Sequence, residues 1–120
     1  MGGVATFHES EIPWAGPLVG GVMERTGGRA RRKLIGDPDL GLYVTLSEYD
    51  PNIVIEAHSH DQPELMYVLE GEFTVDGRRY GPGSVLRFPA HTVYGPLVAG
   101  PHGTRFLVIR PGQTRTLIPE

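Results

Sequence analysis

Two histidines and a glutamate lie close enough along the chain to converge on one ion. His58 and His60 are separated by a single residue, and on a strand that spacing sends both side chains to the same face. A proline-containing turn at 61–63 follows, so Glu64 can open the neighbouring strand and bring its carboxylate to the pair. Two neutral imidazoles and a carboxylate suit iron(II), manganese, nickel or zinc, and leave positions open for water, oxygen or substrate. We therefore expect one divalent metal ion per chain; the alternative is a surface pair of histidines beside a solvated glutamate.

The elements that must position these residues are short β-strands. No helical period persists for three turns, whereas short apolar or alternating runs separated by turn residues recur. Asp76-Gly77 is typical of a two-residue hairpin, and Gly71 and the segment 100–103 predict breaks or turns. The predicted strands are 42–47, 53–60, 65–69, 73–75, 78–80, 84–88 and 104–109. Strands of this length and spacing predict an all-β sandwich or barrel.

Length and composition exclude several classes of protein. The chain has 120 residues, which is enough for one domain with a real core. It has no cysteine, which excludes disulfides, thiolate metal sites and cysteine nucleophiles. A net charge of -3 argues against binding nucleic acid or anionic membranes through bulk charge. The apolar run at 106–109 is far too short to span a bilayer, and the N-terminus does not resemble a signal peptide. We therefore expect a cytoplasmic protein with no nucleic-acid or membrane partner.

The spacing of the candidate ligands resembles the first motif of the cupin family, G-x5-H-x-H-x3-E-x6-G. The residues in its positions are Asn52, His58, His60, Glu64 and Gly71. Only the leading glycine differs, and asparagine is a usual substitute where φ is positive. The resemblance implies that the two histidines and the glutamate bind the metal inside a barrel.

The second cupin motif, G-x5-P-x-G-x2-H, maps onto Gly83, Pro89, His91 and Tyr94. His91 stands in a glycine position, and Tyr94 replaces the histidine that usually supplies a fourth ligand. His91 is therefore either a substitute ligand or an exposed turn residue. We expect Tyr94 to act in catalysis by donating a hydrogen bond to substrate or metal-bound oxygen; the alternatives are a direct ligand and a packed core tyrosine.

The resemblance implies a cupin-type jelly-roll (double-stranded β-helix) barrel over residues 42–110, open at one end. We expect one domain over 1–120, with an irregular N-terminal arm at 1–40. The resemblance also implies a frequent homodimer in which N-terminal strands pack across or swap between subunits. Apolar residues of the arm that a second copy could cover are Ile12, Trp14, Leu18, Val19 and Val22.

The favoured function is a metal-dependent enzyme that acts on a small organic molecule. Dioxygenase chemistry leads, because a face of two histidines and one carboxylate is the arrangement of non-haem iron oxygenases. A redox-neutral isomerase, cyclase or lyase needs the same ligands and stays open, as do a non-catalytic, metal-supported binding module and a metal-free protein. The cupin fold alone does not choose among them.

Other polar residues give weaker signals. The basic cluster of Arg29, Arg31, Arg32 and Lys33 is predicted to be solvated. Arg87 and Arg105 lie in predicted strands and could bind an acidic substrate if either faces inward. His8 and His102 are predicted to lie at the surface.

Overall fold

The structure is a computed structural model, and it describes residues 3–15, 30–112 and 116–117. Its elements in chain order are η1 (Glu9–Glu11), β1 (Ala30–Leu34), η2 (Pro38–Leu40), β2 (Tyr43–Tyr49), β3 (Val54–Ile55), β4 (Ser59–His60), β5 (Glu64–Val75), β6 (Arg78–Tyr80), β7 (Val85–Phe88), β8 (Leu97–Arg110) and β9 (Thr116–Leu117). Apart from the short 3-10 turns η1 and η2, all the described elements are strands, which confirms the predicted all-β class. None of the described helices has the length and apolar character needed to cross a membrane. The domain boundaries stay predictions.

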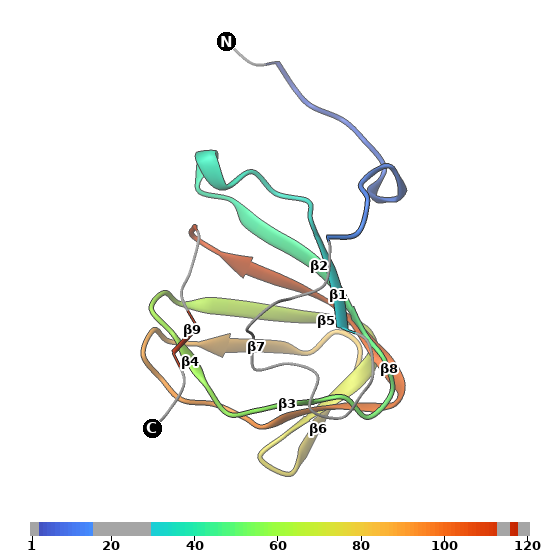
Figure 1. The fold of residues 1–120 in the computed structure, drawn as a ribbon, viewed down its shortest axis with the longest axis vertical. Helices are drawn as coiled ribbons and strands as arrows, with labels where there is room; N and C mark the ends of the chain where they lie inside the picture. The colour runs from blue at the N-terminus through green and yellow to red at the C-terminus, as the bar shows by residue number, and fades with distance from the viewer. Residues whose placement is uncertain (1–2, 16–29, 113–115, 118–120) are drawn as a thin grey trace.

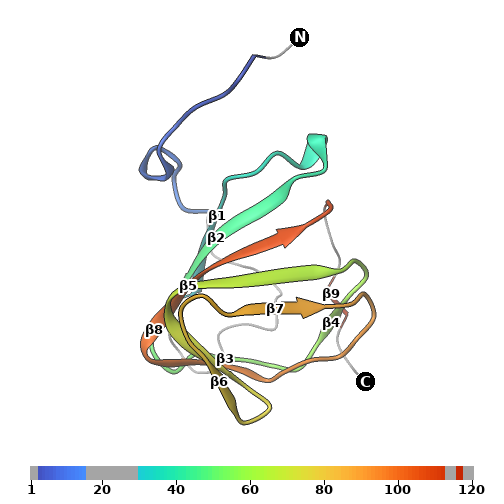
Figure 2. The ribbon, with the colours of Figure 1, turned by 180° about the vertical axis from the view of Figure 1, so that it is seen from behind.

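All strand pairs are antiparallel, and most strands join one sheet in the order β1-β2-β8-β5-β6. β3 adds to β8 and β7 adds to β5, while β4 and β9 form a separate pair. In Figure 1, β2, the end of β8, β5 and β7 lie in that order from top to bottom, and Figure 2 shows the same stack from behind. The first half of β8 pairs with β3 and its second half with β2, so this long strand joins the two sides of the fold.

The core is formed by side chains at alternate positions of the long strands. On β5, Glu64, Met66 and Val68 are buried, while Leu65 and Tyr67 face the other way. Buried aromatic rings fill the middle of the fold: the Phe73 and Phe106 rings meet edge to face with centroids 4.8 Å apart. Glu64 is therefore a charged residue on the face of β5 that points into the core, where its neighbours Met66 and Val68 are apolar.

The strands β5 and β8 continue through positions where the sequence predicts breaks. Gly71 lies inside β5 and residues 100–103 lie inside β8, so the predicted turn there is wrong. Both strands bend instead: Gly71 has φ 74° and Gly103 has φ 82°, and the β5–β8 register shifts around Gly71. A Cβ atom on Gly71 would lie 2.0 Å from the Gly103 carbonyl oxygen. Glycine is required here for both φ and space.

Another predicted strand also differs in the structure. The segment 53–60 forms two short strands, β3 and β4, rather than one. His58 lies between them and pairs with Tyr94 in an isolated bridge. The Asp76-Gly77 hairpin is as predicted, with φ 50° and 78° at its two central residues.

The N-terminal arm covers the face of β1 that points away from the core. Lys33 on that face is only 4% exposed, so the prediction of a solvated cluster is wrong for this residue. Its Nζ donates to the carbonyl oxygens of Glu9 (2.8 Å) and Ile12 (3.3 Å), forms an ion pair with the Glu9 carboxylate and lies 4.4 Å from the Trp14 ring centroid. The sequence pattern could not reveal this, because the covering segment is remote in sequence. The predictions for Leu18, Val19, Val22 and Arg29 lie outside the described residues.

The glycine requirement at the bend gives the first testable prediction. Gly71→Ala should lower the free energy of unfolding by about 3 kcal/mol, because a positive φ costs roughly 1–2 kcal/mol and the methyl group would overlap Gly103. Gly77→Ala is the matched control, since Gly77 has a similar φ of 78° and open space around it. It should lose only about 1 kcal/mol. Urea unfolding measures both, and equal losses would contradict the close approach.

Candidate functional site

Four buried side chains from separate segments meet beside the aromatic core. They are His58, His60, Glu64 and Tyr94. The His58 and Tyr94 backbones bond reciprocally (N–O distances 3.0 and 2.9 Å), while His60 belongs to β4 and Glu64 begins β5. The structure thus brings the three predicted metal ligands and the predicted catalytic tyrosine together. We call these four side chains the His-Glu-Tyr cluster.

The polar atoms of the His-Glu-Tyr cluster lie within hydrogen-bond distance of one another. The Nε2 atoms of His58 and His60 are 3.2 Å apart, and the Tyr94 hydroxyl lies 3.1 Å from each. The His60 Nε2 is also 3.1 Å from Glu64 Oε2. The Tyr94 hydroxyl faces the other carboxylate oxygen, Oε1, at 3.4 Å. One small volume therefore holds two imidazole nitrogens, a carboxylate and a phenol.

The orientation of the His58 ring is fixed by the backbone. Its Nδ1 lies 2.7 Å from the Glu56 carbonyl oxygen. A carbonyl oxygen only accepts, so Nδ1 carries a proton, and this favours the tautomer whose Nε2 lone pair faces the cluster. This support by a carbonyl group is the usual way in which proteins aim a metal-binding histidine.

Tyr94 is held as a neutral hydrogen-bond donor. Its ring stacks on Phe88, with centroids 3.8 Å apart and planes 20° from parallel. Burial raises the pKa of the Tyr94 phenol far above its ordinary value, and the nearby charge of Glu64 raises it further. The hydroxyl thus keeps its proton at any ordinary pH.

Arg110 also contacts the cluster, and it was not among the site residues predicted from the sequence. Its Nε and Nη2 both donate to Glu64 Oε2, at 3.2 and 3.1 Å. The guanidinium is largely buried and lies 5.5 Å from the Tyr43 ring centroid. Alternation along the last strand could have found it, because Arg110 is two residues from the buried Val108 and faces the same way.

The remaining candidate residues lie apart from the cluster. His91 has φ 59° and an exposed side chain, and its backbone N–H donates to the His60 carbonyl oxygen at 2.7 Å. A role for His91 as a metal ligand stays a prediction. Arg87 is exposed on β7, and Arg105 pairs with Glu48 (2.8 Å) and Glu9 (3.1 Å) away from the cluster.

The cluster is not a preformed metal cage. Within the described parts of the chain, no three or more His, Cys, Asp or Glu side chains stand around a point that could already hold a metal ion. Instead the donor atoms contact one another directly, and Arg110 engages the Glu64 oxygen that lies nearest His60. Holding an ion therefore requires the side chains to separate slightly around it.

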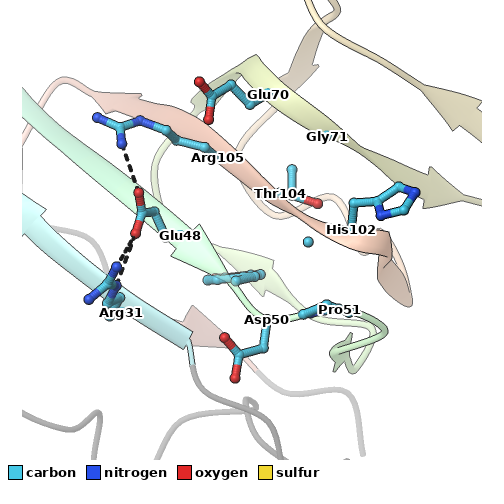
Figure 3. A pocket seen from close by; sticks show the side chains of 11 residues that line it. Arg31, Glu48, Asp50, Pro51, Glu70, Gly71, His102, Thr104 and Arg105 are labelled. Carbon is cyan, nitrogen blue, oxygen red and sulfur yellow. Dashed lines mark hydrogen bonds and ion pairs between the residues drawn. The ribbon is translucent and has the colours of Figure 1, made fainter.

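Among the described residues, a cavity lies at each end of β2. One is an open groove of about 590 Å³ whose lining includes Glu64 and Arg110. The other has about 260 Å³ and is lined mainly by polar groups, including Arg31, Glu48 and Arg105 (Figure 3). Only the first adjoins the His-Glu-Tyr cluster.

Comparison with known proteins identifies the fold. A family model described as a cupin domain matches residues 45–110. The chain is similar to the polyketide cyclase RemF from Streptomyces resistomycificus (24% identity, TM-score 0.75, covering 95% of this chain and 84% of that one). It is also similar to KdgF from Halomonas sp. (25% identity, TM-score 0.68, 91% and 96% covered) and to an acetylacetone dioxygenase from Acinetobacter johnsonii (12% identity, TM-score 0.71, 100% and 80% covered). No curated protein matches the chain. The predicted cupin-type jelly roll is confirmed.

The buried pair of Arg110 and Glu64 gives the second prediction. Arg110→Met leaves the Glu64 carboxylate buried without its cation, so the free energy of unfolding should fall by about 3 kcal/mol. Adding Glu64→Gln should restore most of this loss, because both charges are then gone. Arg87→Met, at an exposed arginine, is the control and should change stability by less than about 0.5 kcal/mol. Urea unfolding of wild type, Arg110→Met, Glu64→Gln, the double variant and the Arg87→Met control measures this coupling, and additive effects of the two changes would contradict it.

Proposed function

The chain belongs to the cupin family, and from that premise we propose that it is a metal-dependent enzyme acting on a small organic molecule. The observation that carries the proposal is the convergence of His58, His60 and Glu64 in one buried cluster. We propose that these three residues hold one divalent ion per chain, of iron, manganese, nickel or zinc. His91 is a further candidate ligand that would have to turn inward.

The donor set and its spacing suit such an ion. Ligand atoms at adjacent corners of an octahedron with bonds of ~2.1 Å lie about 3.0 Å apart. The corresponding separations here are 3.2 Å between the two imidazole nitrogens and 3.1 Å between His60 and Glu64. Small side-chain rotations would therefore open the centre of the cluster to an ion. The Glu56 carbonyl group already aims the His58 lone pair toward that centre.

When bound, the metal would supply Lewis acidity and, in the case of iron, access to dioxygen chemistry. The chain's own residues would do the rest. Tyr94 would donate its hydroxyl proton in a hydrogen bond to a substrate oxygen, since the phenol stays neutral. Phe88 would hold the Tyr94 ring in place by stacking, and Arg110 would orient the Glu64 carboxylate through its two hydrogen bonds. Burial of all four cluster residues would keep bulk water away from the reacting atoms.

The leading reaction class is oxidation by dioxygen, because two histidines and one carboxylate leave room for both oxygen and substrate. A redox-neutral isomerase, cyclase or lyase is the second candidate. It is favoured by Tyr94, a neutral donor 3.4 Å from a carboxylate, which together could move a proton on a bound substrate. A non-catalytic, metal-supported binding module is the third. Oxygen uptake with diketones, catechols and hydroxyketones separates the first class, and product formation without oxygen indicates the second.

We also propose that the protein forms a homodimer in the cytoplasm and has no nucleic-acid or membrane partner. The arm supports pairing, because Val4 and Phe7 are 93% and 53% exposed. The absence of cysteine fits a reducing compartment, and the acidic net charge disfavours polyanions.

The metal proposal is tested by elemental analysis of protein purified without chelators. Wild type should contain about one divalent ion per chain, and His60→Ala should contain almost none, because the ion loses one of three ligands. His102→Ala is the matched control and should retain the ion, since His102 lines the distant polar pocket. His91→Ala tests the fourth ligand. Equal metal content in wild type and His60→Ala would show that the ion is not bound at this cluster.

The role of Tyr94 is tested by Tyr94→Phe. The variant should keep its metal and its unfolding midpoint, because the stacked ring remains. Turnover should fall about 10²-fold, since a hydrogen-bond donor used in the reaction is lost. Metal analysis and steady-state kinetics measure the two effects separately. Loss of the ion would instead identify Tyr94 as a direct ligand.

A further inference from the structure

The groove beside the cluster has an apolar wall. Its volume of about 590 Å³ falls within the range of small-molecule sites. Leu42, Leu65, Phe88 and Ile109 line it, at the end of the sheet where β2 and β5 begin and β7 and β8 end. Leu42 and Ile109 are 55% and 38% exposed, so the described residues leave part of this apolar surface uncovered. The body of a fitting ligand is therefore apolar.

The charged groups of the groove favour an anion. The described lining contains two arginines, Arg87 and Arg110, and one carboxylate, Glu64. Both Glu64 oxygens face the cluster: Oε2 contacts Arg110 and His60, and Oε1 faces Tyr94. Arg110 uses Nε and Nη2 for Glu64, and its Nη1 has no hydrogen-bond partner among the described residues. A guanidinium edge with unused donors therefore lies beside an apolar wall.

The second pocket shows the opposite arrangement. In Figure 3, Arg31 and Arg105 both turn to the Glu48 carboxylate between them. Asp50 and Glu70 add further negative charge to that lining. The arginines there are neutralised, and the net charge disfavours an anion. The two cavities thus differ in charge as well as in polarity.

We propose that the groove binds an apolar carboxylic acid, with its carboxylate on Arg110 and its hydrocarbon body against Phe88, Leu42 and Ile109. A guanidinium binds a carboxylate through charge-assisted hydrogen bonds, which are stronger where apolar walls reduce access of water. Glu64 belongs to both the groove lining and the His-Glu-Tyr cluster, and Arg110 lines the groove and contacts Glu64, so a ligand here lies next to the proposed metal ligands. The claim that this acid is the substrate rests on the proposed function. The claim that the groove binds the acid is independent of the proposed function.

The probes are 2-naphthoate and its neutral analogue 2-naphthamide, titrated calorimetrically into chelator-treated wild-type protein. The acid should bind about tenfold more tightly than the amide, because the guanidinium attracts a charged carboxylate more strongly than an uncharged amide oxygen. Arg110→Gln should abolish this preference. The glutamine amide at position 110 can still donate a hydrogen bond to Glu64, which helps the variant fold. Arg105→Gln is the matched control and should keep the preference, because Arg105 belongs to the other pocket.

A second measurement uses the unaltered protein and so does not depend on a variant's stability. In spectra of protein labelled with 15N-arginine, the Arg110 Nε–H resonance should shift with naphthoate and should shift much less with the same concentration of naphthamide. Equal affinity for acid and amide, a preference that survives Arg110→Gln, or no saturable binding of either probe would overturn the proposal. If neither probe binds and light scattering shows a dimer, the apolar wall would instead be the surface that a second copy of the chain covers.

The two proposals fail separately, because these titrations contain no metal. A protein that binds naphthoate through Arg110 but takes up no metal would overturn the proposed function alone. A protein with metal on His60 but no preference for the acid would overturn the ligand assignment alone.

Discussion

One buried carboxylate, that of Glu64, links the fold to its candidate site. A carboxylate inside a protein is stable only when charged or hydrogen-bonding partners surround it. Here Arg110 supplies the charge, while His60 and Tyr94 face the two oxygens. Glu64 begins β5 and Arg110 ends β8, so their ion pair joins two neighbouring strands at one end of the barrel. The same contacts that stabilise this end of the sheet also bring the imidazoles to the carboxylate.

The bends in the long strands make that meeting possible. With positive φ at Gly71 and Gly103, β5 and β8 each pair on two sides of the fold instead of running on as a flat sheet. The two paired segments that contain His58 and Tyr94 can then lie close to the start of β5. Phe88 at the end of β7 completes the arrangement by stacking on Tyr94. A close contact between two glycine backbones thus supports a cluster of four polar side chains.

Local spacing predicts much of this cluster but not its surroundings. The two-residue interval between His58 and His60, together with the turn before Glu64, was enough to predict that they converge. Alternation along β8 places Arg110 on the inward face, but its contact with Glu64 depends on strand register across the sheet, which no local pattern contains. Lys33 was misjudged for a similar reason: its burial depends on an arm some twenty residues away in sequence. The segment 100–103 has the composition of a turn, but strand pairing on both sides keeps it extended.

The proposed function requires that the His-Glu-Tyr cluster hold a metal ion, although its donor atoms contact one another directly in this structure. Anomalous diffraction from crystals of protein purified without chelators tests this directly, because it locates an ion among named atoms. We predict one anomalous peak per chain, about 2.0–2.3 Å from the Nε2 atoms of His58 and His60 and from a Glu64 oxygen. A clear map without such a peak, in which the two imidazoles and the carboxylate still hydrogen bond to one another, would contradict the account.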